Sequence, residues 1–296
     1  MRLTEILSLI SNGDVIKDGE FTSLGLAVSK CDEKLLTFIE NEKYISSLGE
    51  NISCVITTEE LSEVLKEKYG VILSKNPRLD YFKLHNKLAG NKDYIRKSFD
   101  TIIGDECSIS NSAVISEKNV VIGKNVKIEE FVVIRENTII GDNVVIRSGC
   151  ILGGEGFEFK RTDDTIMNVI HCGGVIIENN VEIQYNTCID KALYTWDNTI
   201  IGEYTKIDNL VHLEHGVKIG ERCMIASNTV IGGRTVVGEE SWIGLGAIIS
   251  NGLVLGNKIS ISLGSVVTKN LADNEKVSGN FAINHDKYIN FIKSIR

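Results

Sequence analysis

An aliphatic residue recurs at every sixth position through most of this sequence. A period of six fits neither an α-helix, with 3.6 residues per turn, nor independent strands, with a period of two. It indicates a coil of three short flat strands, in which the aliphatic side chains point inward and stack from coil to coil. The pattern predicts a parallel β-helix, and so a mainly β fold, over residues 101–267. The recurring positions are Ile103, Ile109 and Ile115, then, after one extra residue, Ile122, Ile128, Ile134, Ile140, Ile146 and Leu152, and every sixth residue from Ile177 to Val267 except Thr195.

The residue after each aliphatic position has to turn a corner of the coil. Glycine takes the left-handed backbone conformation at no steric cost, and it follows in Ile140-Gly141 and Ile201-Gly202, among others. The stacked aliphatic side chains then form one continuous core along the axis. The series is interrupted at residues 153–176, and an excursion of this length from a regular solenoid is more often a binding loop than a defect.

Residues 1–100 lack the six-residue period and predict a small α/β domain. Helical spacing, a Thr cap and a leading Pro indicate helices in three segments, and short apolar runs indicate strands in three others. The expected helices are 1–10, 58–70 and 77–89, and the expected strands are 35–39, 53–57 and 71–75.

Residues 268–296 also leave the period and form the predicted C-terminal helical tail. Helical spacing is shown by Tyr288, Ile289, Ile292 and Ile295. We expect this short helix to pack over the open end of the coil, because an uncovered end would invite edge-to-edge pairing.

The composition argues against nucleic-acid binding and against a membrane span. The 296 residues carry 32 Lys and Arg against 40 Asp and Glu, a net charge of −8, whereas nucleic acids require a basic footprint. No apolar run approaches the ~18 residues of a spanning helix, and the N-terminus lacks the basic segment of a signal peptide. Seven scattered cysteines without a CxxC pair indicate reduced thiols in a cytoplasmic protein.

Four stretches of the chain carry a resemblance to one family. They are LLTFIENEKYISSL at 35–48, ILGGEGFEF at 151–159, VEIQYNTCIDKA at 181–192 and IDNLVHLEHGVKIG at 207–220. Together with the hexads, they resemble the UDP-3-O-acyl-glucosamine N-acyltransferases of lipid A synthesis, within the wider hexapeptide acyltransferases. The resemblance implies a left-handed β-helix, a homotrimer with active sites between adjacent β-helices, and a nucleotide-recognising N-terminal domain. It also implies acyl transfer from a thioester to a sugar amine.

The resemblance assigns the catalytic role to His215, six residues after Asn209. A sugar ammonium must lose a proton before it attacks a thioester, and an imidazole suits that transfer. Asp197 lies 18 residues before His215 and would orient the ring if the coil register holds, although an exposed turn Asp is nearly as plausible. Asn209 is a candidate to hydrogen-bond the substrate, with a simple corner Asn as the alternative.

Phe38, Asn41 and Tyr44 match the family's base-binding residues. Their alternative role is that of a core Phe beside surface residues. Uracil and thymine share a pairing edge, so the motif does not choose between UDP and dTDP. A second substrate-contacting set is expected in the glycine-rich loop entry, where the alternative is a loop exit without ligand contact. The candidates there are Gly154, Glu155 and Phe157, flanked by Gly153 and Gly156.

A metal site is not expected. His212 and His215 form an HxxH pair, but a zinc site needs a third protein ligand, and neither His171 nor His285 has a recognisable spacing. The mechanism needs no permanent cofactor, only the acyl thioester as co-substrate.

Two departures from the family pattern concern the donor and the oxyanion. Leu253 follows Asn251-Gly252, where the family commonly has a second His, so that a backbone N–H must hold the oxyanion. The tail is short and the net charge negative, which favours acyl-CoA over an acidic acyl carrier protein as donor.

The sequence therefore predicts a trimeric N-acyltransferase that transfers an acyl group from acyl-CoA to a dTDP- or UDP-linked amino sugar for a cell-surface glycan. The lipid A enzyme itself, with an acyl carrier protein donor, is the alternative. A β-helix metalloenzyme of the carbonic anhydrase type and a purely structural β-helix are the remaining hypotheses.

Overall fold

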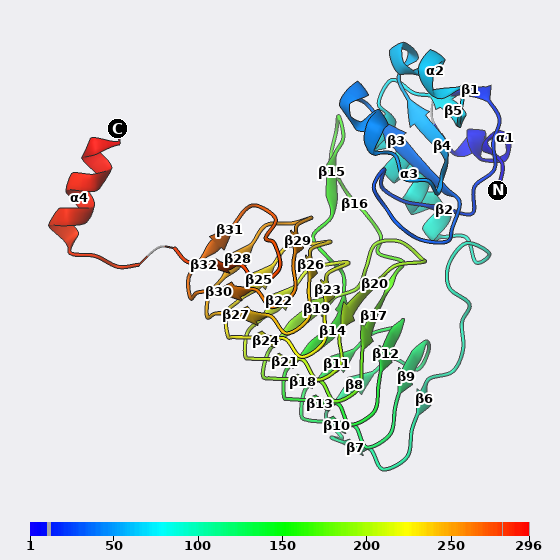
Figure 1. Ribbon diagram of the computed structural model, residues 1–296. Coiled ribbons are helices and arrows are strands. Elements are labelled where there is room, and N and C mark those ends of the chain that lie inside the picture. Colours follow the sequence, from blue (N-terminus) through cyan, green and yellow to red (C-terminus); the bar gives the residue numbers. More distant parts are fainter. Residues whose placement is uncertain (11–12, 280, 296) are drawn as a thin grey trace.

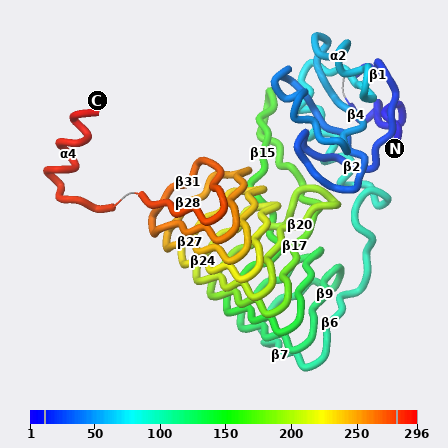
Figure 2. Tube along the Cα trace, viewed as in Figure 1, coloured from blue at the N-terminus to red at the C-terminus, as the bar shows by residue number. Residues whose placement is uncertain are grey.

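The computed structural model describes residues 1–10, 13–279 and 281–295. An N-terminal α/β domain, drawn in blue and cyan, stands beside the middle of a long β-helix, and a helix follows at the C-terminal end (Figure 1). The Cα trace in Figure 2 shows the regular coils stacked along one axis, with the N-terminal domain on one side.

The N-terminal domain is a five-stranded sheet in the order β1-β5-β4-β3-β2. Its strands are β1 (Asp14–Lys17), β2 (Ser23–Leu24), β3 (Leu35–Ile39), β4 (Ile52–Thr57) and β5 (Gly70–Leu73). Its helices are α1 (Leu3–Ile6), α2 (Glu59–Leu65) and α3 (Pro77–Ala89), with 3-10 turns η1 (Leu7–Leu9) and η2 (Glu42–Ser47). The three expected strands are confirmed, as is the helix at 77–89. The first helix is shorter than expected, and β1 and β2 were not anticipated.

The β-helix has three faces, and each face is a parallel sheet. The first face contains β6 (Ile102–Ile103), β9 (Val120–Ile122), β12 (Thr138–Ile140), β17 (Gly174–Ile177), β20 (Asn198–Ile201), β23 (Lys218–Ile219), β26 (Val236–Val237) and β29 (Val254–Leu255). The second contains β7 (Ser108–Ile109), β10 (Lys127–Ile128), β13 (Val145–Ile146), β18 (Glu182–Ile183), β21 (Lys206–Ile207), β24 (Met224–Ile225), β27 (Trp242–Ile243), β30 (Ser260–Ile261) and β32 (Lys276–Val277). The third contains β8 (Val114–Ile115), β11 (Val133–Ile134), β14 (Ile151–Gly154), β19 (Cys188–Asp190), β22 (His212–Leu213), β25 (Val230–Ile231), β28 (Ile248–Ile249) and β31 (Val266–Val267).

The aliphatic residues of the hexads form one core inside these faces. Ile183, Ile207 and Leu213 are fully buried, and they belong to a single cluster that runs from Val120 to Val267. The predicted left-handed hexapeptide β-helix is thereby confirmed. The burial explains the period, since only the last residue of each short strand points into the coil.

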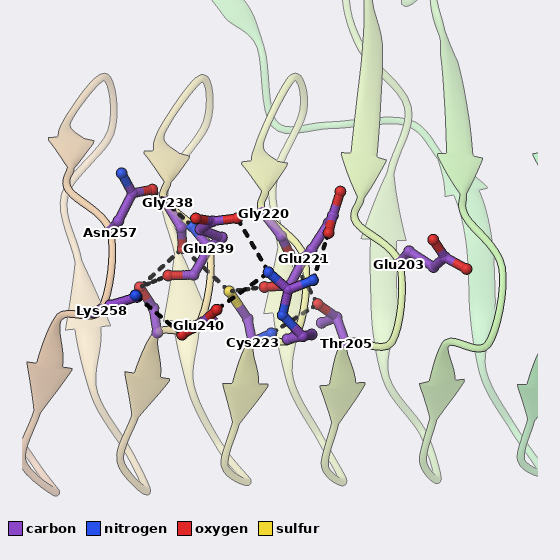
Figure 3. Close-up of polar contacts among 12 residues, drawn as sticks. Glu203, Thr205, Gly220, Glu221, Cys223, Gly238, Glu239, Glu240, Asn257 and Lys258 are labelled. Atoms are coloured by element: carbon purple, nitrogen blue, oxygen red, sulfur yellow. Dashed lines mark hydrogen bonds and ion pairs between the residues drawn. The ribbon is translucent and has the colours of Figure 1, made fainter.

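Polar contacts between successive coils hold the corners in register. At the corner in Figure 3, the Thr205 hydroxyl donates to Gly220 O at 2.9 Å and the Cys223 thiol to Gly238 O at 3.2 Å. The Arg222 guanidinium pairs there with carboxylates from its own coil and the next: Glu221, Glu239 and Glu240. Each corner therefore binds the corner above it.

Two consecutive coils carry insertions, and both insertions leave the coil between the third face and the first. The first lies between β14 and β17 and contains the hairpin of β15 (Phe159–Arg161) and β16 (Ile166–Asn168). The second lies between β19 and β20. Leu213 pairs with Ile189, which is 24 residues earlier, so this coil is six residues longer than a regular one. An insertion of six leaves the hexad phase unchanged, which is why only Thr195 marked it in the sequence.

The N-terminal domain packs on both insertions. Val169 from the first and Tyr194 from the second are buried in one cluster with Tyr81 and Phe82 of α3. The Tyr81 and Tyr194 hydroxyls are hydrogen-bonded at 3.0 Å, and the Trp196 indole N–H donates to a backbone oxygen of β2 at 2.9 Å. The insertions are thus the surface on which the first domain is mounted.

The coil continues past Val267, where the six-residue series ends. β32 pairs with β30, and Leu271 and Val277 pack against the end of the core. The helix α4 (His285–Ser294) forms as expected, but the expectation that it packs over the coil was wrong. Its residues are exposed or half-buried, because the preceding segment already covers the core. In the described parts of the chain, no helix combines the length and apolarity needed to cross a membrane.

Candidate active site

His215 lies on the corner between the third and first faces, directly after β22. This is the corner from which both insertions leave, one and two coils earlier. The side chain is 6% exposed, although the residue stands on a turn of the coil surface. The hairpin insertion folds back over this corner and covers the ring.

Two glycines shape the space around the His215 ring. A Cβ atom at Gly156, in the first insertion, would lie 2.8 Å from Nδ1, and one at Gly233, in the next coil, would lie 2.8 Å from Nε2. Both distances are shorter than real Cβ contacts, so only glycine fits at these positions. The loop entry therefore uses Gly156 for a close approach to the imidazole.

Charged side chains surround Nε2 of His215. Arg234 Nη1 lies 3.2 Å from it, and Glu158 Oε2 lies 3.7 Å from it. Burial, and then the positive charge of Arg234, lowers the pKa of His215 to about 4. The imidazole is therefore neutral at pH 7, as a general base has to be.

The other two predicted catalytic residues do not contact His215. Asp197 forms an ion pair with Lys218 at 2.5 Å, and its backbone oxygen accepts from Arg96 at 2.8 Å. The Asn209 side-chain oxygen accepts from the backbone N–H of Tyr185 at 3.1 Å, which is a corner contact. The six-residue insertion carries Asp197 into the interface with the N-terminal domain.

Phe38 and Tyr44 line one hollow of about 460 Å³ between the N-terminal domain and the hairpin. We call it the interdomain hollow. Phe38 packs against Tyr81 with ring centroids 5.1 Å apart, and Tyr44 is half exposed. Asn41 does not line the hollow, and its side-chain oxygen caps η2. The full lining is Leu26, Ala27, Val28, Phe38, Ile39, Glu40, Tyr44, Ser47, Arg78, Phe82, Glu158, Lys160 and Arg234.

Glu155 and Phe157 line a different hollow of about 690 Å³ under the hairpin, which we call the hairpin hollow. Phe157 is 84% exposed, and Glu155 pairs with Lys191 at 2.6 Å. Gly154 is the last residue of β14 and does not line it. The predicted loop residues and the predicted base-binding residues are therefore on separate hollows, and the segment 155–158 and His215 lie between them.

The hairpin hollow also contains an ion pair from the third face. His212 Nε2 lies 3.0 Å from Asp190 Oδ2, and this hydrogen bond raises the pKa of His212. Among the residues that the structure describes, no three His, Cys, Asp or Glu side chains are grouped as metal ligands would be. His212 thus has a carboxylate partner beside the site.

Sequence reasoning missed three residues around His215. Arg234 was within reach of it, since Gly233 stands 18 residues after His215 and stacks on it in a regular coil. Glu158 and His171 come from the irregular first insertion, where no period places a residue. The His171 ring is buried 5.3 Å from that of His215, centroid to centroid. Leu253, in place of the family's second His, packs against the coil core instead.

Comparison with known proteins gives the family. The family model of bacterial transferase hexapeptide repeats matches residues 119–154 and 198–233. A UDP-3-O-acylglucosamine N-acyltransferase of Fusobacterium nucleatum is 38% identical over 249 residues, which cover 76% of this chain and 74% of the relative. An enzyme of the same name from Francisella tularensis is 47% identical over 88 residues, 29% of this chain. That match spans only a quarter of the relative's length.

Solved structures support the same fold. A UDP-N-acetylglucosamine acyltransferase from Campylobacter jejuni aligns over 66% of this chain and 79% of its own, with a TM-score of 0.53 and 20% identity. One from Francisella novicida aligns over 64% of this chain and 71% of its own, with a TM-score of 0.51 and 20% identity. The long match to the Fusobacterium relative, on a hexapeptide β-helix with a half-buried Phe38 and a buried His215, shows that the chain belongs to the UDP-3-O-acylglucosamine N-acyltransferase family.

Proposed function

We propose that this chain is an N-acyltransferase that moves an acyl group from a thioester to the amino group of a nucleotide-linked amino sugar. The observation that carries the proposal is the position of His215. The residue matches the family's catalytic histidine, is neutral at pH 7, and lies between two hollows.

The interdomain hollow suits the nucleotide sugar. Phe38 and Tyr44 offer aromatic surface for a pyrimidine ring. Cationic side chains of Lys160 and Arg234 line the same hollow and can pair with phosphate oxygens. A nucleotide held in this way brings its sugar toward His215, which contacts Arg234.

The hairpin hollow suits the acyl donor. The aromatic rings of Phe157 and Phe159 lie 4.9 Å apart, centroid to centroid, and Cys188 and Leu210 add apolar surface. An acyl chain or the thioester arm can bury its methylene groups there. The thioester carbonyl then faces His215 across the segment 155–158.

The chemical step is a direct transfer. His215 takes a proton from the sugar ammonium, and the free amine attacks the thioester carbonyl, forming the C–N bond. The tetrahedral intermediate collapses, the C–S bond breaks, and the thiolate leaves as a thiol with the proton from His215. The products are an amide and a free thiol, and the step needs no metal and no covalent enzyme intermediate. In the absence of the family's second His, a backbone N–H holds the oxyanion.

The names of the relatives favour UDP-3-O-acylglucosamine as acceptor, which was the alternative to the first expectation of a dTDP- or UDP-sugar acylated from acyl-CoA. We therefore place the UDP-linked acceptor first. Acyl-CoA and acyl carrier protein remain the two candidate donors.

We further propose that the protein is a homotrimer with sites between adjacent β-helices. Outward-facing apolar side chains run along the regular coils and suit contact with further copies. They include Trp242, Ile248, Val254 and Val266, each between 43% and 56% exposed. Light scattering of the purified protein tests this, with a mass of three times 32.7 kDa expected.

A free-thiol assay tests the activity. Acyl-CoA and acyl carrier protein donors of short and long chain are crossed with UDP-3-O-acylglucosamine and with UDP- and dTDP-linked amino sugars. The wild type and His215→Ala are run in parallel. Thiol release that requires both an amino sugar and His215 supports the proposal. Release without any acceptor preference, unchanged in His215→Ala, contradicts it.

A further inference from the structure

Arg234 joins the interdomain hollow to the catalytic histidine. It follows Gly233 on the corner that stacks on His215, and its backbone N–H donates to His215 O at 2.9 Å. The guanidinium lines the hollow, and 34% of its side chain is exposed, against 6% for His215. One part of the guanidinium is thus accessible from the hollow while another part contacts the imidazole.

This contact occupies the lone pair that a general base uses. Arg234 Nη1 lies 3.2 Å from His215 Nε2, and a guanidinium can only donate. Nε2 is therefore the acceptor, and the proton of the neutral ring is on Nδ1. Nδ1 faces Gly156 and has no hydrogen-bond partner among the described residues. His215 can accept a substrate proton at Nε2 only after the guanidinium moves.

The surroundings of Arg234 leave it able to bind an anion. Its nearest carboxylate is Glu158, at 3.6 Å, which is longer than a hydrogen bond. Glu158 is itself paired with Lys160, whose ammonium lies 4.2 Å from the centroid of the Phe82 ring. The charged residues that line the hollow are Arg78, Lys160 and Arg234 against Glu40 and Glu158, an excess of one positive charge.

A nucleotide diphosphate matches this arrangement. Its base fits the aromatic surface of Phe38 and Tyr44, and its phosphates offer doubly charged oxygen pairs that a guanidinium binds in a fork. Such a partner competes well against a neutral imidazole nitrogen and a carboxylate that is already paired.

Resting on the function proposed above, we infer that Arg234 is a positioning residue that caps Nε2 of His215 and is drawn off by the diphosphate of a bound nucleotide sugar. The base is then released only when the acceptor is in place. The cap also protects the donor: an uncapped His215 would activate water, whose oxygen bonds to the thioester carbon while the C–S bond breaks, giving a carboxylic acid and a thiol.

The first test observes the ring and requires no turnover. Histidine-selective ¹⁵N labelling reports the nitrogen shifts, and the His215 signals are assigned from their loss in His215→Ala. In Arg234→Gln without ligand, we expect Nε2 to lose the signature of an acceptor bonded to a cation, and the ring to titrate at higher pH. The other charged or titratable groups that face the ring, Glu158, His171 and Asp190, are unchanged in this variant.

Adding UDP to the wild type should move the Nε2 signal in the same direction as Arg234→Gln does, and UDP should move it much less in the variant. An Nε2 signal that is the same in wild type and Arg234→Gln, both without UDP, overturns the inference. Failure of UDP to bind, measured by calorimetry, would instead count against the proposed function, and the comparison without UDP would still test the cap.

The second test measures donor hydrolysis without acceptor. We expect acyl thioester hydrolysis to rise about tenfold in Arg234→Gln, the scale of losing one hydrogen bond to a charged group. Acyl transfer to the nucleotide sugar should fall, and Arg234→Lys should restore part of it. Arg222→Gln is the matched control, since Arg222 stands on another corner among three carboxylates (Figure 3). Hydrolysis that stays at the wild-type rate in Arg234→Gln contradicts the cap.

Discussion

The coils from β20 to β31 and the two coils before them share one core but differ at one corner. In both regions an aliphatic residue of each strand is buried in the same cluster. In the regular coils the corner after the third face is a short turn, whereas in the earlier two it opens into the insertions at 155–173 and 191–197. The N-terminal domain, the hairpin and both hollows are located at these insertions.

The comparison shows that the repeat and the site make separate demands on the sequence. A corner points outward, so it can be lengthened without removing any residue from the core. His215 stands on the first regular corner after the two insertions, and Gly233 stands on the next. The regular coils thus supply the base, and the insertions supply the groups that cover it.

The largest expected effect separates the corner residues of the two regions. His215→Ala should lower acyl transfer by about 10²–10⁴-fold, because it removes the proton acceptor. Asn251→Ala changes the same corner two coils later, where the side chain is exposed, and should leave the rate unchanged. The thiol-release assay measures both. Equal losses in the two variants would show that the corner acts through the fold alone.

Core truncation should affect both regions alike. Ile189→Ala, between the insertions, and Ile225→Ala, in the regular coils, each delete a buried side chain and should cost about 2–5 kcal/mol of the free energy of unfolding. Urea denaturation followed by circular dichroism compares them. A much smaller loss for Ile189→Ala would mean that the inserted coils are loosely packed.

The pH dependence of stability should depend on the buried base. The pKa of His215 is lowered to about 4 in the folded protein, against 6.5 for a free histidine, so between these values the unfolded chain binds the extra proton. Stability should therefore fall as the pH drops from 6.5 to 4, by about 3 kcal/mol from this residue. His215→Gln should remove that part of the pH dependence. Parallel urea titrations at pH 7 and pH 5 measure the difference, and identical slopes in both proteins would refute the burial argument.

The smallest effect concerns the contact of the N-terminal domain with the second insertion. Tyr194→Phe removes a buried hydroxyl that bonds Tyr81 and should cost about 1 kcal/mol of the free energy of unfolding. Tyr204→Phe is the control, because Tyr204 is an exposed tyrosine on a corner of the regular coils. Thermal unfolding of the three proteins gives the comparison. No difference between the two variants would mean that the hydroxyl pair adds nothing to docking.

Much of the fold followed from the sequence because the coil is local and periodic. Each strand is defined by a few consecutive residues and pairs with the next coil, so counting in sixes located the core. The second insertion escaped because six extra residues keep the phase. The position of α4 escaped because helical spacing defines a helix but not its packing partner.

The sequence by itself determined the β-helix core, several elements of the first domain and His215 as the candidate base. Tertiary structure decided which side chains surround that base. Glu158, His171 and Arg234 meet at His215 because an irregular hairpin folds back over a regular corner, and Asp197 is drawn away to Lys218. Periodicity specifies contacts between neighbouring coils, whereas the fold of an insertion depends on its packing against the first domain, which no local pattern encodes.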